Sequence, residues 1–183
     1  MRIISGKARG TKLYTLEGNN TRPTLDRVKE SLFNIIQSKL EGKVFLDLFS
    51  GSGAVGLEAV SRNARKAILC DNNKEAISII KKNASKTHLE ELVDIYNTTF
   101  EKLIKNILDE KIDIIYIDPP YATNYTIEAI KLLIKYDLIS DDGIVILETD
   151  DEQKIMKQLQ NINIKIINKR KYGRAHLIFL QKN

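Results

Sequence analysis

Apolar residues near the start of the chain follow two different periods. Alternation over residues 1–5 and 11–16, around a turn at 6–10, predicts a short β-hairpin. Beyond Pro23 the period changes to three and four residues, which predicts a helix over about 24–40. One face of this helix is apolar and should pack on a core; it carries Leu25, Val28, Leu32, Ile35 and Ile36.

From residue 43 onward, short apolar runs alternate with amphipathic segments. The runs predict strands over 44–49, 67–70, 93–96, 113–117, 143–147, 163–167 and 175–180. The segments between them predict helices over 51–62, 74–86, 100–110, 125–136 and 153–159. Repeated β-α units imply a parallel sheet with helices on both faces, so we expect a doubly wound, Rossmann-like α/β fold. In such sheets ligands bind beyond the carboxyl ends of the strands.

Composition narrows the class of protein. The 183 residues, 43% of them hydrophobic, favour one folded domain, 1–183, in which 1–40 extend a core at 41–183. A single cysteine excludes an internal disulfide, and with two histidines besides we expect no metal site. There is neither a run of apolar residues long enough for a membrane span nor a signal peptide, so we expect a cytoplasmic protein without a membrane partner.

The net charge of +5 is unevenly distributed along the chain. Residues 1–30 hold seven Lys or Arg against three Asp or Glu, and residues 153–183 hold eight against none. The middle of the chain is therefore acidic, with 14 basic residues against 21 acidic ones. Basic ends around an acidic middle indicate a polyanionic partner that the ends contact, although exposed lysines also serve simple solubility.

A glycine-rich turn follows the first strand of the alternating region. The segment 47–56, DLFSGSGAVG, contains G-x-G-x-x-G at Gly51, Gly53 and Gly56, and Asp71 follows 20 residues after the first glycine. Glycines allow the backbone to approach a ligand closely, and the acidic residue can bind a ribose diol. A NAD(P)-dependent oxidoreductase is therefore one interpretation of this turn.

Asp47 argues against a dinucleotide. It precedes Gly51 by four residues, where its carboxylate would face a pyrophosphate of like charge. The spacing D-x-x-x-G-x-G resembles motif I of class I methyltransferases, whose donor, S-adenosylmethionine, carries a sulfonium and an ammonium cation. The resemblance predicts that Asp71 accepts the ribose hydroxyls, with a helix N-cap as its alternative role. The remaining predicted cofactor residues are Phe49, Ser50, Gly51, Ser52, Gly53, Asn72 and Thr98.

The fourth strand of the alternating region ends in Asp118-Pro119-Pro120-Tyr121. Two prolines cannot continue a central strand, so they give a stiff loop just past its end. Asp118 and the carbonyl of Pro119 can accept the two N–H groups of an exocyclic amine, which turns the nitrogen lone pair out of the ring plane. Tyr121 can stack on the base. The segment resembles motif IV of amino-methyltransferases, although an Asp-Pro-Pro sequence also occurs in ordinary turns.

The whole chain resembles the RsmD family. The similarity is carried by MRIISGKARG over 1–10, TRPTLDRVKESLFN over 21–34, FLDLFSGSG over 45–53, DPPY over 118–121 and KYG over 171–173. The resemblance implies a class I methyltransferase sheet of order 3-2-1-4-5-7-6. It also implies transfer of a methyl group to the exocyclic N2 amine of a guanine in a loop of small-subunit (16S) ribosomal RNA.

Two basic groups are candidates for contacts with RNA. The first lies on the predicted hairpin and before the helix, at Arg2, Lys7, Arg9, Lys12 and Arg22. The second lies near the last strand, at Lys171, Tyr172 and Arg174. We expect a monomer that acts on 16S rRNA or on a 30S assembly particle. A DNA adenine-N6 methyltransferase, a NAD(P)-dependent oxidoreductase and a non-catalytic RNA-binding module remain as alternatives.

Overall fold

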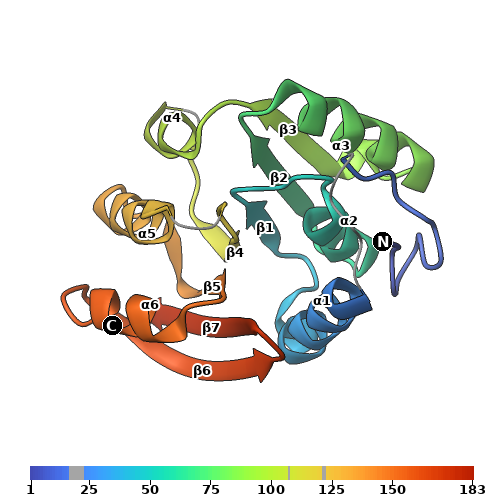
Figure 1. The fold of residues 1–183 in the computed structure, drawn as a ribbon. Coiled ribbons are helices and arrows are strands. Elements are labelled where there is room, and N and C mark those ends of the chain that lie inside the picture. The colour runs from blue at the N-terminus through green and yellow to red at the C-terminus, as the bar shows by residue number, and fades with distance from the viewer. Residues whose placement is uncertain (17–22, 107, 121–122) are drawn as a thin grey trace.

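The protein is built on one seven-stranded sheet. The structure, a computed structural model, describes residues 1–16, 23–106, 108–120 and 123–183 (Figure 1). The strand order is β3-β2-β1-β4-β5-β7-β6, and β7 alone runs antiparallel to its neighbours. The predicted α/β fold and its strand order are confirmed. The strands are β1 (Val44–Asp47), β2 (Lys66–Asp71), β3 (Val93–Asn97), β4 (Ile112–Ile117), β5 (Ile139–Thr149), β6 (Ile164–Tyr172) and β7 (Ala175–Lys182).

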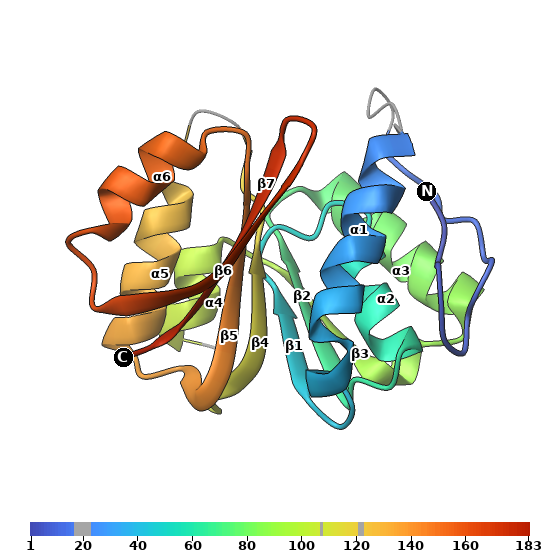
Figure 2. The same ribbon diagram turned by 90° about the horizontal axis from the view of Figure 1, so that it is seen from below.

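Helices cover both faces of the sheet (Figure 2). One face carries α1 (Pro23–Ile36), α2 (Ala54–Ser61) and α3 (Lys74–Thr87), and the other carries α4 (Phe100–Asn106), α5 (Tyr125–Lys135) and α6 (Glu152–Leu159). Short 3-10 helices occupy Gln37–Lys39 and Glu90–Leu92. None of the helices in the described ranges has the length and apolar character needed to cross a membrane.

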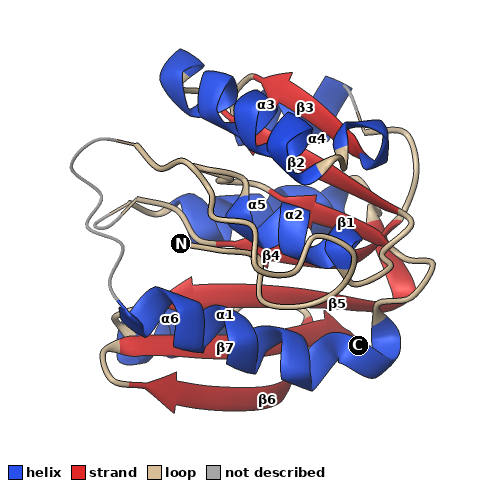
Figure 3. Ribbon diagram, turned by 90° about the vertical axis from the view of Figure 1, so that its right-hand side faces the viewer, coloured by secondary structure: helices blue, strands red, loops and turns tan. Residues whose placement is uncertain are grey.

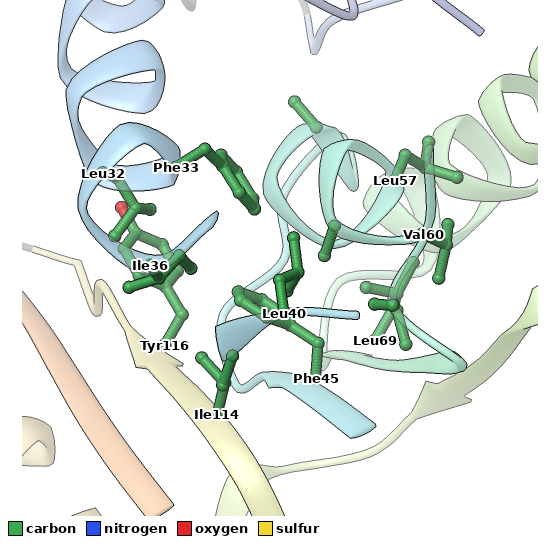
Figure 4. Packing of buried hydrophobic residues seen from close by; sticks show 14 of the residues in the cluster. Leu32, Phe33, Ile36, Leu40, Phe45, Leu57, Val60, Leu69, Ile114 and Tyr116 are labelled. Carbon is green, nitrogen blue, oxygen red and sulfur yellow. The ribbon is translucent and has the colours of Figure 1, made fainter. Parts of the chain in front are cut away.

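The central strands are apolar because helices bury them from both sides. On the face of α1 to α3, Phe45 and Tyr116 pack into the same core cluster as Leu32 and Phe33 of α1 (Figure 4). The rings of Phe33 and Phe45 lie 6.1 Å apart. Strand residues of odd number in β1 and even number in β4 therefore point to this face, which fixes the direction of the side chains at the strand ends.

The N-terminal segment forms an antiparallel loop, with one bridge between Arg2 and Lys12 in place of two regular strands. Its backbone is instead fixed by two buried side chains of α2. Glu58 accepts from the backbone N–H groups of residues 4 and 5, at 2.8 and 3.0 Å, and Ser61 Oγ accepts from Ala8 N at 3.0 Å. These donors are used for docking the loop on α2, so a regular hairpin ladder does not form.

Element boundaries differ from the sequence prediction mainly in the last third of the chain. Strand β5 begins at Ile139, and β6 continues to Tyr172, five residues beyond the predicted end. The basic residues 169–171 therefore belong to a strand. As an edge strand, β6 pairs with β7 alone and exposes most of its side chains, so it lacks the apolar signal on which the prediction depended.

Candidate active site

The predicted site residues come from strands that end at one edge of the sheet. Asp47, at the end of β1, lies opposite Leu69 of β2 and Tyr116 of β4. Figure 3 shows the strands from the side, with β5 and β6 ending toward the same side and β7 running back. The segments that follow β1, β2 and β4 thus meet at this carboxyl edge, where doubly wound sheets bind their ligands.

Hydrogen bonds fix the turn between β1 and α2. Ser50 donates its backbone N–H to the Cys70 carbonyl at 2.9 Å, and its Oγ accepts from Cys70 N at 3.0 Å. Gly51 and Gly53 adopt φ of 53° and 77°, a region that favours glycine. Gly56 has a different role, because a Cβ there would come within 2.0 Å of Leu69. The third glycine therefore allows α2 to pack closely on β2.

Asp71 connects the glycine turn to the end of β2. Its Oδ2 accepts from Gly51 N at 2.9 Å and its Oδ1 accepts from Asn73 N at 2.8 Å. Asn73, whose side chain accepts from Glu75 N, is the N-cap of α3. The cap role that was the alternative for Asp71 is therefore filled by Asn73. A carboxylate held in this way has lone pairs left for the hydroxyl groups of a ligand.

Asp47 is a buried carboxylate with an unused acceptor. Its side chain is 1% exposed, and among the described residues no donor reaches its Oδ1. Burial raises the pKa of Asp47 to about 7. The negative charge of Asp71 also raises this pKa, whereas hydrogen bonds from the Phe49 and Gly56 backbone lower it. A buried carboxylate oxygen without a donor fits a cationic group of a ligand, so this site fits S-adenosylmethionine.

Phe49 of the glycine turn packs with two aromatic side chains from α4 and α5, and the three rings form an apolar wall beside the turn. Phe49 lies 5.3 Å from Phe100 and 6.2 Å from Tyr125 between ring centroids, and the Phe49 and Tyr125 rings are parallel within 2°. Tyr125 remains 39% exposed. Sequence reasoning found Phe49 but missed Phe100 and Tyr125, because their proximity depends on how α4 and α5 pack.

Two further predicted cofactor residues lie near the end of β2. Thr98, two residues before Phe100, donates its N–H to the Asp71 carbonyl at 3.2 Å, and Asn72 is exposed.

The Asp-Pro-Pro segment leaves β4 at the same edge. Thr123 Oγ1 donates to the Pro120 carbonyl at 3.0 Å, which uses this carbonyl within the loop. Pro119 precedes it and is half-buried, and Tyr121 lies outside the described residues. Asp118 is exposed at the edge of the sheet, but neighbouring protein atoms reduce the hydration of its carboxylate. This partial desolvation and the charges of Glu148 and Asp47 raise the pKa of Asp118.

Asp47 and Asp118 lie near each other at the carboxyl edge. Asp47 lies opposite Tyr116 on the neighbouring strand, and Asp118 follows Tyr116 by two residues. Phe45 and Tyr116 both pack under α1, so alternation along each strand directs Asp47 and Asp118 to this same face. Two carboxylates placed in this way can accept hydrogen bonds from one ligand and stabilise positive charge between them.

Glu148 and Tyr116 are parts of the site that sequence reasoning missed. The Tyr116 hydroxyl donates to Glu148 Oε2, and burial together with this carboxylate raises the pKa of the tyrosine. Burial also raises the pKa of Glu148. The signal available in the sequence was a glutamate directly after the apolar run 143–147, at the end of a strand.

The basic residues of the N-terminal loop are exposed. Arg2, Lys7, Arg9 and Lys12 all lie on its solvent side. The loop begins next to the glycine turn, because Ser52 Oγ lies 3.8 Å from the Met1 sulfur. The buried Asn83 side chain links the other end of the loop to the turn, donating to the carbonyls of Tyr14 and Ser52 at 3.0 and 2.9 Å. Arg22 lies outside the described residues.

The hairpin between β6 and β7 reaches the carboxyl edge. Glu148 and Thr149 pair with Leu177 and His176, so the tip at 172–175 lies beyond the end of β5 (Figure 2). Tyr172 packs against the core cluster on the face of α1, and Arg174 is exposed at the tip. Lys171 pairs with His176 in the ladder, and its side chain therefore lies on the other face of the hairpin from Tyr172.

Comparisons with known proteins show which family and which solved structures this chain is similar to. The family model described as conserved hypothetical protein 95 matches residues 1–181. A Haemophilus influenzae protein named ribosomal RNA small subunit methyltransferase D is 33% identical over 158 residues, which cover 85% of this chain and 82% of that protein. YlbH of Bacillus subtilis is 34% identical over 157 residues, 85% of each chain. The solved structure of yhhF from Escherichia coli has a TM-score of 0.85 at 26% identity and covers 100% of this chain and 98% of that one.

Proposed function

This chain belongs to the conserved hypothetical protein 95 family, the RsmD family, and from this premise we propose that it methylates the exocyclic N2 amine of a guanine in a loop of 16S rRNA, with S-adenosylmethionine as donor. Its fold is that of class I methyltransferases, which use this donor. The name of the Haemophilus influenzae relative supports ribosomal RNA as the substrate. The N2 amine of guanine is our more specific assignment.

One observation carries the proposal: Asp47 ends β1 and Asp118 directly follows the end of the neighbouring strand β4, so both carboxylates lie at the carboxyl edge. Asp47 presents a buried oxygen without a donor, which fits a cation of the methyl donor. Asp118 follows a strand end within a proline loop, which fits an amine acceptor. A cation and an amine held on either side of one short gap are what methyl transfer requires.

The residues around the glycine turn would hold the donor. Asp47 would pair with its cationic part, and Asp71 would accept its ribose hydroxyls from the position fixed by Gly51 and Asn73. The wall of Phe49, Phe100 and Tyr125 offers an apolar surface for a flat ring beside Thr98. When bound, S-adenosylmethionine supplies a methyl group on a sulfonium sulfur, and this sulfur is a good leaving group because it departs as a neutral thioether.

The Asp-Pro-Pro loop would hold the amine. Asp118 and the Pro119 carbonyl each accept one N–H of the amine, and this arrangement directs the nitrogen lone pair away from them. Asp118 then stabilises the positive charge that develops on nitrogen. Since the pKa of Asp118 is raised, its carboxylate is also suited to accept the proton that the methylated amine must lose.

We assign RNA binding to the two exposed basic groups that border this edge. A guanine in a loop can leave its stack and present its amine to an edge site. The N-terminal loop carries Arg2, Lys7, Arg9 and Lys12, and the hairpin tip carries Lys171, Tyr172 and Arg174. We propose that a monomer uses both groups to bind phosphates of 16S rRNA, free or in a 30S assembly particle.

The competing functions fit this site less well. In a dinucleotide-binding turn, backbone N–H groups face the pyrophosphate, but here Asp71 accepts from Gly51 N. A carboxylate in this position repels a phosphate. A DNA adenine methyltransferase would share the Asp-Pro-Pro loop, but the relatives from Haemophilus influenzae and Escherichia coli are named ribosomal RNA small subunit methyltransferase D.

The test is methyl transfer to small-subunit RNA that lacks the modification, both as free RNA and as a 30S assembly particle. With labelled S-adenosylmethionine, we expect one product, N2-methylguanosine at one position by mass mapping. Asp118→Asn should slow its formation about 10²- to 10³-fold, whereas Asp142→Asn, at an exposed residue near the start of β5, should not. Label on adenine N6, or no label on either RNA form, would contradict the proposal.

A further inference from the structure

A second carboxylate lies beside Asp118. Strands β4 and β5 are parallel, and Ile117 pairs with Leu147 in the last recorded step of their register. Glu148 is the next residue of β5, and Asp118 directly follows the last residue of β4, so continuation of this register brings their backbones to about 5 Å. Tyr116 and Ile146, two residues earlier, both pack into the core cluster under α1, so Asp118 and Glu148 also share that face.

Tyr116 holds Glu148 in a defined position. The tyrosine is 4% exposed and its ring packs against α1 (Figure 4), so its hydroxyl has little freedom to move. This hydroxyl donates to Glu148 Oε2. Among the described residues no donor reaches the other oxygen, Oε1, and the side chain is only partly buried. One oxygen of Glu148 is therefore fixed by the protein, and the other is available to a ligand.

The mechanism described above does not use Glu148. Two carboxylates side by side repel each other, and loss of contact with water raises the pKa of both. Such an arrangement costs stability in the free protein, which indicates that a ligand with two adjacent donors compensates for it.

Guanine has two such donors on its Watson–Crick edge, the N1–H and the N2 amine. Adenine offers an amine next to N1, which is an acceptor and would face a carboxylate unfavourably. We propose that Glu148, positioned by Tyr116, accepts the N1–H of the target base while Asp118 accepts the N2 amine, and that Glu148 thereby selects guanine. This inference rests on the proposed function and adds the residue that determines base specificity.

The test replaces the target guanine by 2-aminopurine, which keeps the C2 amine but has an unprotonated N1. Small-subunit particles are assembled with either base at the methylated position, and kcat/KM is measured for each. Wild-type protein should prefer guanine by about 10- to 100-fold, the discrimination typical of one good base contact. Equal use of both bases by wild-type protein would overturn the inference.

In Glu148→Gln, an amide N–H can donate to the N1 of 2-aminopurine, so the preference for guanine should fall at least tenfold. The ratio of kcat/KM for guanine to kcat/KM for 2-aminopurine is compared between variants, which cancels the different intrinsic reactivity of the two bases. Glu110→Gln, an exposed residue before β4, should keep the wild-type ratio. An unchanged ratio in Glu148→Gln would show that Glu148 does not read the base.

Tyr116→Phe provides a second variant, because it removes the hydroxyl and keeps the packed ring. The preference for guanine should fall, while the affinity for S-adenosylmethionine stays within about twofold of wild type. If Glu148→Gln does not fold, an unchanged preference in Tyr116→Phe overturns the inference. Absence of any transfer from wild-type protein to the guanine particle contradicts the proposed function instead, so the two failures are distinguishable.

Discussion

Asp71 accepts a hydrogen bond from the backbone N–H of Gly51 at 2.9 Å, which places a carboxylate on the glycine turn itself. In a dinucleotide-binding turn, the backbone N–H groups are free to face the pyrophosphate. The turn therefore has the glycine spacing of a dinucleotide site but the charge of a site for a cationic or neutral ligand. This charge separates two functions that the glycine pattern alone leaves open.

Selective binding of the methyl donor follows from that contact. We expect isothermal titration to show binding of S-adenosylmethionine and none of NAD or NADP up to millimolar concentration. Asp71→Ala should weaken donor binding about 10- to 100-fold, because it removes a charge-strengthened contact and frees the turn. Binding of NAD that is as tight as that of the methyl donor would contradict this assignment.

The pKa of Asp47 predicts that donor binding depends on pH. Its pKa is raised to about 7 by burial, and a bound cation favours the ionised form. Binding should therefore tighten as the pH rises from 6 to 8 and release a proton at pH 6. Titrations in buffers of different ionisation enthalpy measure this proton. Asp47→Asn should bind the donor more weakly and lose the pH dependence; a wild-type affinity independent of pH would show that Asp47 does not meet the cation.

The raised pKa of Asp47 also predicts that the folded protein without donor loses stability as the pH rises, whereas donor binding becomes tighter. A carboxyl whose pKa is raised on folding stabilises the folded state most below about pH 4, and this contribution is lost as the pH rises toward 7. Without the donor, Asp47→Asn should therefore melt a few degrees above wild type at pH 8, a gain of about 1–2 kcal/mol for a protein of this size. Differential scanning calorimetry at pH 5 and 8 measures the difference, which should be smaller at pH 5.

Asp118 should affect chemistry more than binding. In Asp118→Asn the amide oxygen still accepts one hydrogen bond, but the negative charge is lost. We expect kcat to fall about 10²- to 10³-fold, as when one electrostatic contact to a transition state is removed. Donor affinity should stay within a few fold. Equal losses in kcat and in donor affinity would contradict the role that we assign to Asp118.

Glu58 should support the fold and not the chemistry. This fully buried carboxylate pairs with Lys29 at 3.2 Å and Arg62 at 2.7 Å and also accepts from the N-terminal loop. Glu58→Ala leaves buried cations without a partner and should cost about 3–5 kcal/mol in urea unfolding. Glu110→Ala, which breaks an exposed pair with Arg65, should cost less than about 1 kcal/mol. Similar losses for both variants would contradict the role of Glu58.

The hairpin tip should contribute to RNA binding through charge. Arg174→Ala should raise the KM for the RNA substrate and reduce the slope of log affinity against log salt by about 1. Arg65→Ala, an exposed arginine at the opposite edge of the sheet, is the matched control and should leave both unchanged. If the two variants behave alike, the hairpin tip is not part of the RNA surface.

Local apolar patterns predicted the alternating strands and helices, and the family resemblance implied the strand order that the structure shows. The glycine turn at 47–56 and the Asp-Pro-Pro segment each follow an apolar run, and in a doubly wound sheet such segments must meet. The family resemblance also holds, since the family model matches nearly the whole chain.

The contacts between distant elements could not be predicted in this way. The pair of Glu58 with Lys29 forms only when α1 packs against α2, whereas its pair with Arg62 is local, four residues along the chain. The pair of Tyr116 and Glu148 depends on the register of β4 and β5, which a single sequence does not define. The end of β6 was missed because an exposed edge strand carries no apolar pattern.

The most direct test of the account is a crystal structure of the protein with S-adenosylmethionine. We predict that Asp47 contacts a cationic group of the donor, that Asp71 binds the ribose hydroxyls, and that the transferable methyl group points toward Asp118. A donor bound away from the glycine turn, or one whose methyl group points away from Asp118, would contradict the claim that these carboxylates form one methyl-transfer site.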